Sequence, residues 1–165
     1  MHTIRKFTPT DWPALWSLLQ ITFASGDTYA YAPDSTEADI YKAWVEQPLA
    51  TYVAVSSSGD LLGTYTLKAN QPGLGSHVCN CGYVVAARAR GQGIAARMCE
   101  HSQAQAIAHG FRAMQFNLVV ATNQVAVRLW QRLGFAIVGT VPSAFRHATL
   151  GYVAAHVMVK DLQPE

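Results

Sequence analysis

The segment from Gly82 to Ala95 combines arginines and glycines in an order that suits phosphate binding. An apolar strand-like stretch comes first, followed by Arg88-Ala89-Arg90-Gly91-Gln92-Gly93 and then a helical run. The first amide groups of a helix have no partner within it, and its dipole is positive there. Glycine lets the backbone come close to phosphate oxygens. The segment therefore predicts a pyrophosphate site at the start of a helix, with Arg88 and Arg90 adding charge at its rim.

Three kinds of phosphate loop compete for this signal. The P-loop pattern G-x-x-x-x-G-K-[S/T] is excluded because none of these glycines is followed by the required lysine and hydroxyl. Gly91 to Ala96 matches the dinucleotide pattern G-x-G-x-x-A, but that site needs an acidic residue about 20 positions later. No acidic residue lies between Glu100 and Asp161. The third pattern, [Q/R]-x-x-G-x-[G/A], fits in two registers, which start at Arg88 and Arg90.

That third pattern resembles the pyrophosphate loop of the GNAT superfamily of acyl-CoA-dependent N-acyltransferases. A second block, residues 123–135 with the sequence NQVAVRLWQRLGF, is similar to the superfamily's N-x-x-A-x-x-x-Y-x-x-x-G-F helix. The strong resemblance covers about Asn80 to Phe135, and the spacing between the two blocks also agrees. A dinucleotide oxidoreductase stays the competing interpretation of the glycine loop.

The resemblance implies acetyl-CoA as the donor and a set of residues that would hold it. The backbone of Val84 and Val85 would bind the pantetheine arm like an added strand, and amides from Arg90 to Ala95 would bind the pyrophosphate. Asn123 would contact the arm, although its position also suits a helix cap. The full expected set is Tyr83, Val84, Val85, Arg88, Arg90, Gly91, Gln92, Gly93, Ile94, Ala95, Asn123, Ala126 and Trp130.

In this superfamily the acceptor amine attacks the thioester directly, so the protein supplies positioning and proton handling. The departing CoA thiolate often takes a proton from a tyrosine on the second block's helix. That position is Trp130 in this chain, which departs from the family pattern. Either another donor serves, with Tyr83 as a candidate, or the thiolate leaves unassisted.

The base that removes the amine proton has no clear candidate. His77 has a suitable intrinsic pKa and lies on the expected strand before the loop, although such a histidine also suits a solvent-facing position. Asn80 stands where many relatives carry a glutamate, and an amide does not accept that proton. Asn80 and Asn117 could together orient a water molecule, or be buried amides with satisfied hydrogen bonds.

The acceptor is expected to be a small-molecule amine such as an amino acid, a polyamine or an amine drug. Asp27, Tyr29 and Tyr31 lie in the loop that commonly shapes this pocket, and they suit an ammonium group through charge and ring faces; ordinary loop packing is the alternative. Phe145-Arg146-His147, between the last two strands, could form the opposite wall. The alternative functions are a non-catalytic acyl-CoA sensor and an acetyltransferase for protein N-termini or lysines.

The elements that must position these residues follow from periodicity and from turn residues. We expect one α/β (α+β) domain over residues 1–165, with a central mixed, mostly antiparallel sheet of six to seven strands and about four helices on both faces. Strands are expected at about residues 3–7, 51–55, 61–67, up to 85, 114–120, 135–141 and 152–159; helices are expected from Thr10 or Asp11, over 36–47, 93–109 and 123–133.

Composition and charge indicate the cellular compartment and the kinds of ligand that the protein could bind. Half of the 165 residues are hydrophobic, and neither a secretion signal nor a membrane span is expected, which favours a cytoplasmic protein. The pair Cys79 and Cys81 suits one face of a strand, so we expect no disulfide or metal site. Residues 1–60 hold three basic and seven acidic residues, whereas residues 61–160 hold nine basic residues and one acidic residue, Glu100. This division suits a polyanionic ligand for the second half, and without a basic run nucleic acid is not expected. A homodimer is the superfamily's common assembly.

Overall fold

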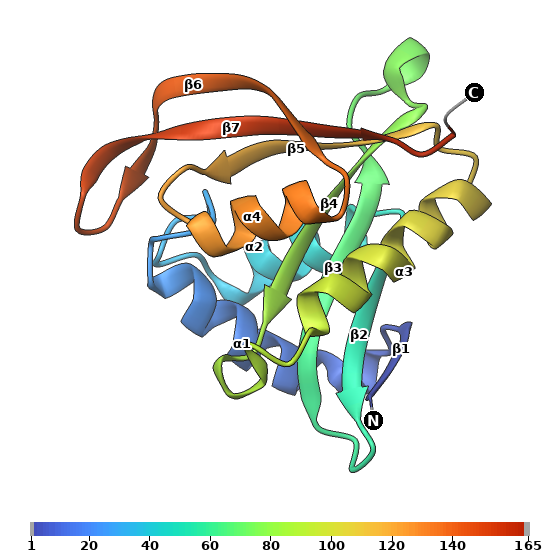
Figure 1. Cartoon of the computed structure of the whole chain (residues 1–165). Coiled ribbons are helices and arrows are strands. Elements are labelled where there is room, and N and C mark those ends of the chain that lie inside the picture. Colours follow the sequence, from blue (N-terminus) through green and yellow to red (C-terminus); the bar gives the residue numbers. More distant parts are fainter. Residues whose placement is uncertain (1, 164–165) are drawn as a thin grey trace.

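The computed structural model describes residues 2–163 as one seven-stranded sheet with helices on both faces (Figure 1). The strands are β1 (His2–Lys6), β2 (Ala50–Ser56), β3 (Leu61–Ala69), β4 (Val78–Val85), β5 (Ala113–Val120), β6 (Ala136–His147) and β7 (Gly151–Asp161). The helices are α1 (Trp12–Ala24), α2 (Glu37–Tyr41), continued by a π-helical turn over Lys42–Glu46, α3 (Ile94–Ala108) and α4 (Gln124–Arg132). Strand order is β1-β2-β3-β4-β5-β7-β6, which confirms the expected mixed, mostly antiparallel sheet.

Helices α1 and α2 cover one face of the sheet. Leu15, Leu19 and Phe23 recur every four residues along α1, so they lie on one side of the helix and are buried. Leu18, next to Leu19 on the helix, is half-buried. The Thr36 hydroxyl accepts the amide of Asp39 and caps α2, as predicted. Trp44 completes this small cluster with an indole that is 2% exposed.

Helices α3 and α4 cover the opposite face, over the larger part of the core. Ile94, Met98 and Cys99 of α3 pack against β3 and β4. Cys79 and Cys81 lie in the same cluster as free, buried thiols, which confirms the prediction that they share one face of a strand.

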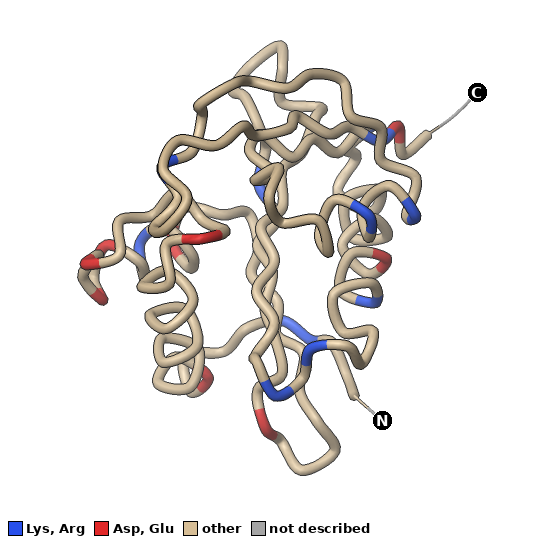
Figure 2. The backbone as a smooth tube through the Cα atoms, turned by 60° about the vertical axis from the view of Figure 1, so that its left-hand side comes forward, with Lys and Arg blue, Asp and Glu red and all other residues tan. Residues whose placement is uncertain are grey.

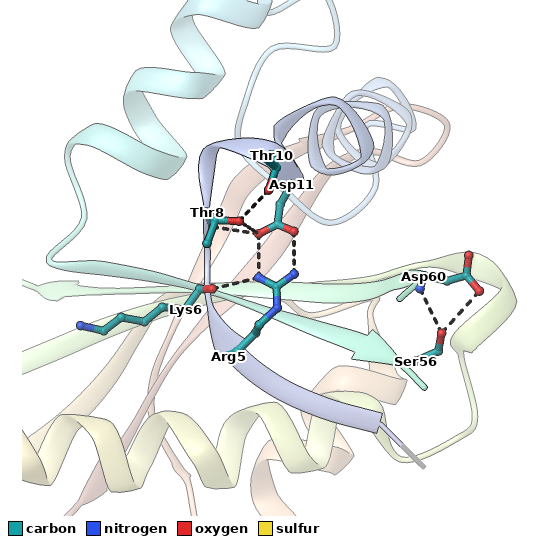
Figure 3. A network of polar contacts seen from close by, with 7 residues as sticks. All are labelled: Arg5, Lys6, Thr8, Thr10, Asp11, Ser56 and Asp60. Atoms are coloured by element: carbon teal, nitrogen blue, oxygen red, sulfur yellow. Dashed lines mark hydrogen bonds and ion pairs between the residues drawn. The ribbon is translucent and has the colours of Figure 1, made fainter. Parts of the chain in front are cut away.

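The passage from β1 into α1 is held by an ion pair (Figure 3). Both terminal nitrogens of Arg5 donate to the carboxylate of Asp11 at 2.8 Å. Asp11 also accepts the amide of Thr8 at 2.8 Å and its hydroxyl at 2.9 Å. These contacts fix the turn that places α1 against the sheet.

Strands β4 and β5 part soon after they meet. They are the parallel pair, and their register runs only through Val78↔Ala113 and Cys79↔Met114. Beyond that point β5 is irregular between Phe116 and Val119, where its pairing with β7 shifts. Figure 1 shows the two strands diverging into a V between the two helical layers.

The final hairpin is longer than expected. The prediction that Phe145-Arg146-His147 connect the last two strands is wrong, because these residues belong to β6 and pair with residues 151–153 of β7. The register shifts between Val141 and Phe145, around Ser143 at φ 54°. Pro142 and this irregularity interrupt the alternating pattern, so the sequence signal for the strand ends early.

None of the helices in residues 2–163 combines the length and apolar character that crossing a bilayer demands.

Candidate functional site

A cavity of about 630 Å³ occupies the V between β4 and β5. Its walls come from the loop 25–31 after α1, from β3, β4 and β5, and from the start of α4. The residues predicted from sequence that line it are Asp27, Tyr29, Tyr31, Asn80, Tyr83, Val84, Val85, Arg90, Asn117, Asn123, Ala126 and Trp130. Two blocks that are distant in the sequence therefore meet at one site.

The turn before α3 presents free amide groups. Gly91 and Gly93 adopt φ 75° and 76°, a left-handed conformation that favours glycine. The first backbone bond of α3 runs from Arg97 to Gly93, and no backbone or side-chain acceptor within residues 2–163 takes the N–H groups of residues 91–96. These amides and the positive end of the helix dipole are suited to an anion.

The side chains around this turn hold it in place. Gln92 donates to the carbonyl of Arg88 at 2.9 Å, and Arg88 donates to the carbonyl of Leu61 at 2.8 Å. Arg88, Gly91, Gln92, Gly93, Ile94 and Ala95 lie beside the cavity rather than in its lining, and Ile94 is buried in the core. Arg90 is the predicted arginine that reaches the cavity wall.

The backbone of β4 shows which residues face the gap. Backbone groups of successive strand residues point to opposite neighbours. The amide of Ala86 donates to the carbonyl of Leu62 in β3. The Val84 carbonyl also faces β3, 2.9 Å from the point where a Cβ on Gly63 would lie. Val84 therefore turns its polar groups toward β3, while Tyr83 and Val85 turn theirs toward the gap. This corrects the expectation that adjacent Val84 and Val85 would both bind an arm there.

Tyr29 reaches across the cavity to that exposed edge. Its hydroxyl donates to the carbonyl of Tyr83 at 2.6 Å, and it fits because Gly82 has no side chain; a Cβ there would lie 3.2 Å from the hydroxyl oxygen. Burial raises the pKa of Tyr29, so it stays a neutral donor. Its ring lies 6.3 Å from that of Tyr31 and 5.9 Å from that of Trp44. Both tyrosines thus pack as a wall and also line the cavity.

A cluster of amides closes the narrow end of the V, on the α1 and α2 side. Asn80 donates to the carbonyl of Gln115 at 3.0 Å and thereby bridges β4 and β5. The side chain of Gln115 donates to Asn117 at 3.0 Å, and Asn117 donates to Asn70 at 2.7 Å. Asn80 and Asn117 both line the cavity, yet no hydrogen bond joins them.

His77 is not brought to the cavity. It lies exposed just before β4, where its carbonyl accepts the amide of Arg112 at 2.9 Å. This is the closed end of the V, so the structure gives the proposed base no access to the site. Within residues 2–163, Asp27 is the only carboxylate in the lining, and its oxygen accepts the Ser25 hydroxyl at 2.6 Å.

Tyr83 uses its hydroxyl inside the core. The oxygen lies 2.7 Å from Ser102 Oγ and 3.6 Å from Met114 Sδ, on the α3 side of the sheet. Burial raises the pKa of this phenol. Its ring centre is 5.0 Å from that of Trp130, which also packs on Phe116 at 5.2 Å. The Tyr83 hydroxyl therefore does not reach the gap, and Trp130 gives the cavity an apolar wall.

Asn123 caps α4, as one of its two predicted roles requires. Its side-chain oxygen accepts the amide of Ala126 at 3.3 Å, and both residues line the cavity. Contact with a bound arm stays a prediction.

Strand β3 also contributes to the cavity, which the sequence motifs did not predict. Thr66 and Lys68 line the cavity beside Asn80 and Gly82 of β4. Alternate residues of a strand share a face, and Thr64, Thr66 and Lys68 form a polar series in an otherwise apolar strand. That period of two was the available signal.

Charge divides in space as it does along the chain. Figure 2 shows most acidic residues about α1, α2 and the loop between them, with others in the turn between β2 and β3, on α3 and near the C-terminus, whereas many Lys and Arg residues mark the turn before α3 and the helices of the other layer. Within residues 2–163, no group of three His, Cys, Asp or Glu residues is arranged as a metal site would require.

Comparison with known proteins agrees with this geometry. Residues 12–135 match the acetyltransferase (GNAT) family model. The chain is 40% identical to the N-acetyltransferase aca1 of Schizosaccharomyces pombe over 98 residues, which are 59% of this chain and 47% of that protein. It thus spans about half the length of this curated relative.

Solved structures share the fold. A GCN5-related N-acetyltransferase from Kribbella flavida superposes with a TM-score of 0.92 and 43% identity, over 97% of each chain. A GNAT superfamily phosphinothricin acetyltransferase from Sinorhizobium meliloti, solved with AcCoA, has a TM-score of 0.86 at 16% identity, over 97% of this chain and 88% of that one. With the family model and the Kribbella flavida relative covering most of its length, the chain belongs to the acetyltransferase (GNAT) family.

Proposed function

We propose that this chain transfers the acetyl group of acetyl-CoA to a primary amine of a small molecule, within a complex that holds both substrates. The observation that carries the proposal is the V between β4 and β5, which has free helix-start amides at one end and a cavity of about 630 Å³ along it. That volume lies in the range typical of small-molecule pockets. Family membership and the AcCoA complex of the Sinorhizobium meliloti neighbour support the donor.

Residues along the V fit each part of acetyl-CoA, from the pyrophosphate to the acetyl end. Amides of residues 91–96 and the Arg90 guanidinium would hold the pyrophosphate. Backbone groups of Tyr83 and Val85 would bind the arm as a strand, and the distance from Val85 to Asn80 is about 17 Å at ~3.3 Å per residue. Trp130 and Ala126 would cover the arm from α4.

When bound, acetyl-CoA would supply a thioester carbon for attack by the amine nitrogen. The C–S bond would break, and the departing CoA thiolate would take up the second proton, which the nitrogen loses as the amide forms. The chain's own part is to orient the two molecules and exclude water. An alkylamine with a pKa of about 10 must lose a proton before it attacks. Asp27 gives the ammonium form a counter-charge and gives that proton an acceptor, directly or through water.

A non-catalytic acyl-CoA sensor is the second candidate, and Trp130 favours it. The indole fills the place of the family's tyrosine, is 8% exposed and provides no acid for the thiolate. Tyr83, the alternative acid, directs its hydroxyl toward Ser102. Under the enzymatic proposal the thiolate leaves without an enzyme acid, which its moderate basicity permits.

One assay separates these functions. Free CoA is measured with acetyl-CoA and a panel of amino acids, polyamines and amine drugs, while acetyl-CoA binding is followed by thermal shift. Release of CoA with at least one amine, together with the N-acetyl product, supports the proposal. Binding without release for every amine would establish the sensor, and stabilisation by NAD rather than acetyl-CoA would overturn both.

The three buried free thiols support a reducing, cytoplasmic setting.

A further inference from the structure

We infer that Lys68 is the anion-recognition residue of the acceptor site, and that the acceptor amine therefore carries a carboxylate or a related anionic group. The inference rests on the proposed function and adds the substrate class to it. It starts from a cation in the cavity that neither the family motifs nor the donor explains.

Lys68 lies in the lining without a partner for its charge. The neighbours of Lys68 are Thr66 on β3, Asn70 just after β3, and Asn80 directly opposite on β4, all of them neutral. Within residues 2–163, its ammonium makes no ion pair or hydrogen bond. The side chain is exposed to the cavity and to solvent, so it is free to meet a ligand.

The position of Lys68 excludes a role at the pyrophosphate. Gly63 pairs with Val85, near the turn that leads to α3, whereas Lys68 pairs with Asn80 at the far end of the same two strands. These two pairs are five residues apart, which is about 17 Å along the strands. A cation at that distance serves whatever lies beside the acetyl end of the donor.

The cavity lining also carries a charge of opposite sign. Asp27, from the loop 25–31, is the only carboxylate lining the cavity within the described residues, and Lys68 comes from the sheet beneath. A molecule with an ammonium and an anionic group suits both charges. A polyamine would bring a second positive group to Lys68, and like charges in a confined site disfavour binding.

Matched acceptors test this assignment. CoA release is measured for L-alanine against L-alaninamide, L-glutamate against L-glutamine, and 2-aminoethylphosphonate against ethanolamine. The enzymes are the wild type, Lys68→Met, Lys68→Arg, Lys68→Glu and the control Lys42→Met, whose exposed lysine lies outside the cavity lining. Each variant is compared with the wild type on the same acceptor, so differences in amine pKa between acceptors cancel.

We expect Lys68→Met to lower kcat/KM about 10- to 100-fold for the acceptors with the additional anionic group, mainly through KM, as loss of a charge-assisted contact predicts. In the pair whose distinguishing group Lys68 binds, the matched partner should change less than about threefold. Lys68→Arg should restore most of the loss, and Lys68→Glu should shift preference toward diamines. The carboxylate and phosphonate arms show which anion is recognised.

Equal losses on both members of each pair, or a wild-type preference for the partner lacking that group, overturn the inference and leave acetyl transfer standing. If none of the amines causes CoA release, the proposed function itself is overturned. Acetyl-CoA thermal shifts of every variant show that the fold and the donor site are intact.

Discussion

The hydroxyl of Tyr29 donates a 2.6 Å hydrogen bond to the backbone carbonyl of Tyr83, so the loop 25–31 is tied to the strand edge that faces the gap. The bond joins residues 54 positions apart. It exists because Gly82 leaves room for the phenol and because burial keeps that phenol protonated.

Replacing Tyr29 by phenylalanine should therefore loosen this wall of the cavity. We expect the free energy of unfolding to fall by about 0.5–1.5 kcal/mol, the usual net value of a lost hydrogen bond. For a chain of this size each kcal/mol lowers Tm by roughly 2–4 °C. Tyr31→Phe is the matched control, because no hydrogen bond of its hydroxyl occurs within residues 2–163. Equal losses in both variants, measured by thermal unfolding, would contradict the assigned role of the bond.

The turn before α3 makes a prediction about the donor. Gly93→Ala places a side chain at φ 76°, a conformation that costs an L-residue about 1–2 kcal/mol. Relief of that strain should move the free amides, and we expect the acetyl-CoA dissociation constant to rise about tenfold or more. Calorimetric titration measures it.

Gly59→Ala is the control for that experiment. Gly59 has φ 88° in the turn between β2 and β3, with open space where a Cβ would stand. It should show a similar loss of stability with acetyl-CoA affinity unchanged. If both variants bind the donor as the wild type does, the turn does not hold the pyrophosphate.

The orientation of Tyr83 predicts a small catalytic effect when its hydroxyl is removed. Tyr83→Phe should leave kcat within about threefold and its pH profile unshifted, because the hydroxyl lies against Ser102 and away from the gap. Stability should fall by about 1–3 kcal/mol, since the variant leaves Ser102 with one partner fewer in a buried place. A large fall in kcat with loss of the alkaline limb of the pH profile would instead make Tyr83 the acid for the thiolate.

The ion pair between Arg5 and Asp11 predicts a dependence of stability on pH. The hydrogen bond from Arg5 lowers the pKa of Asp11 from 3.8 to about 2. A carboxyl group whose pKa is lowered on folding stabilises the protein at pH values above the pKa that the group has in the unfolded chain. That contribution disappears as pH falls from about 4 toward 2.

Asp11→Asn should accordingly cost about 0.5–1 kcal/mol at pH 7, a modest value because solvent screens the pair. The difference from the wild type should shrink as pH is lowered to 3, and it should shrink in high salt at pH 7. Urea unfolding across this pH range measures both effects. A difference that is constant from pH 3 to 7 would show that hydrogen bonds to Thr8, rather than the charge, carry the effect.

Local signals predicted the elements that local chemistry determines. The turn with Gly91 and Gly93, the cap at Asn123 and the cap at Thr36 were each read from neighbouring residues, and the structure confirms all three as helix starts. The burial of Cys79 and Cys81 followed from alternation along one strand.

Features that depend on distant pairing were not predictable in this way. The exclusion of His77 depends on where β4 leaves β5, and the place of Lys68 depends on the register between β3 and β4. The extension of β6 through Phe145 depends on β7, which offers it partners after the irregularity at Ser143. No single segment holds that information.

Two residue pairs of the strand ladder, together with the hydrogen bonds from Arg112 to His77 and from Asn80 to Gln115, join the half of the sheet formed by β1 to β4 to the half formed by β5 to β7. Side chains of both halves share one core cluster, but because the backbone seam is this short we expect part of the amide hydrogen exchange in each half to occur through its own local openings. A donor arm bound between β4 and β5 would add contacts that connect the two halves. We expect acetyl-CoA to slow hydrogen exchange in both halves together, including β7, none of whose residues line the cavity.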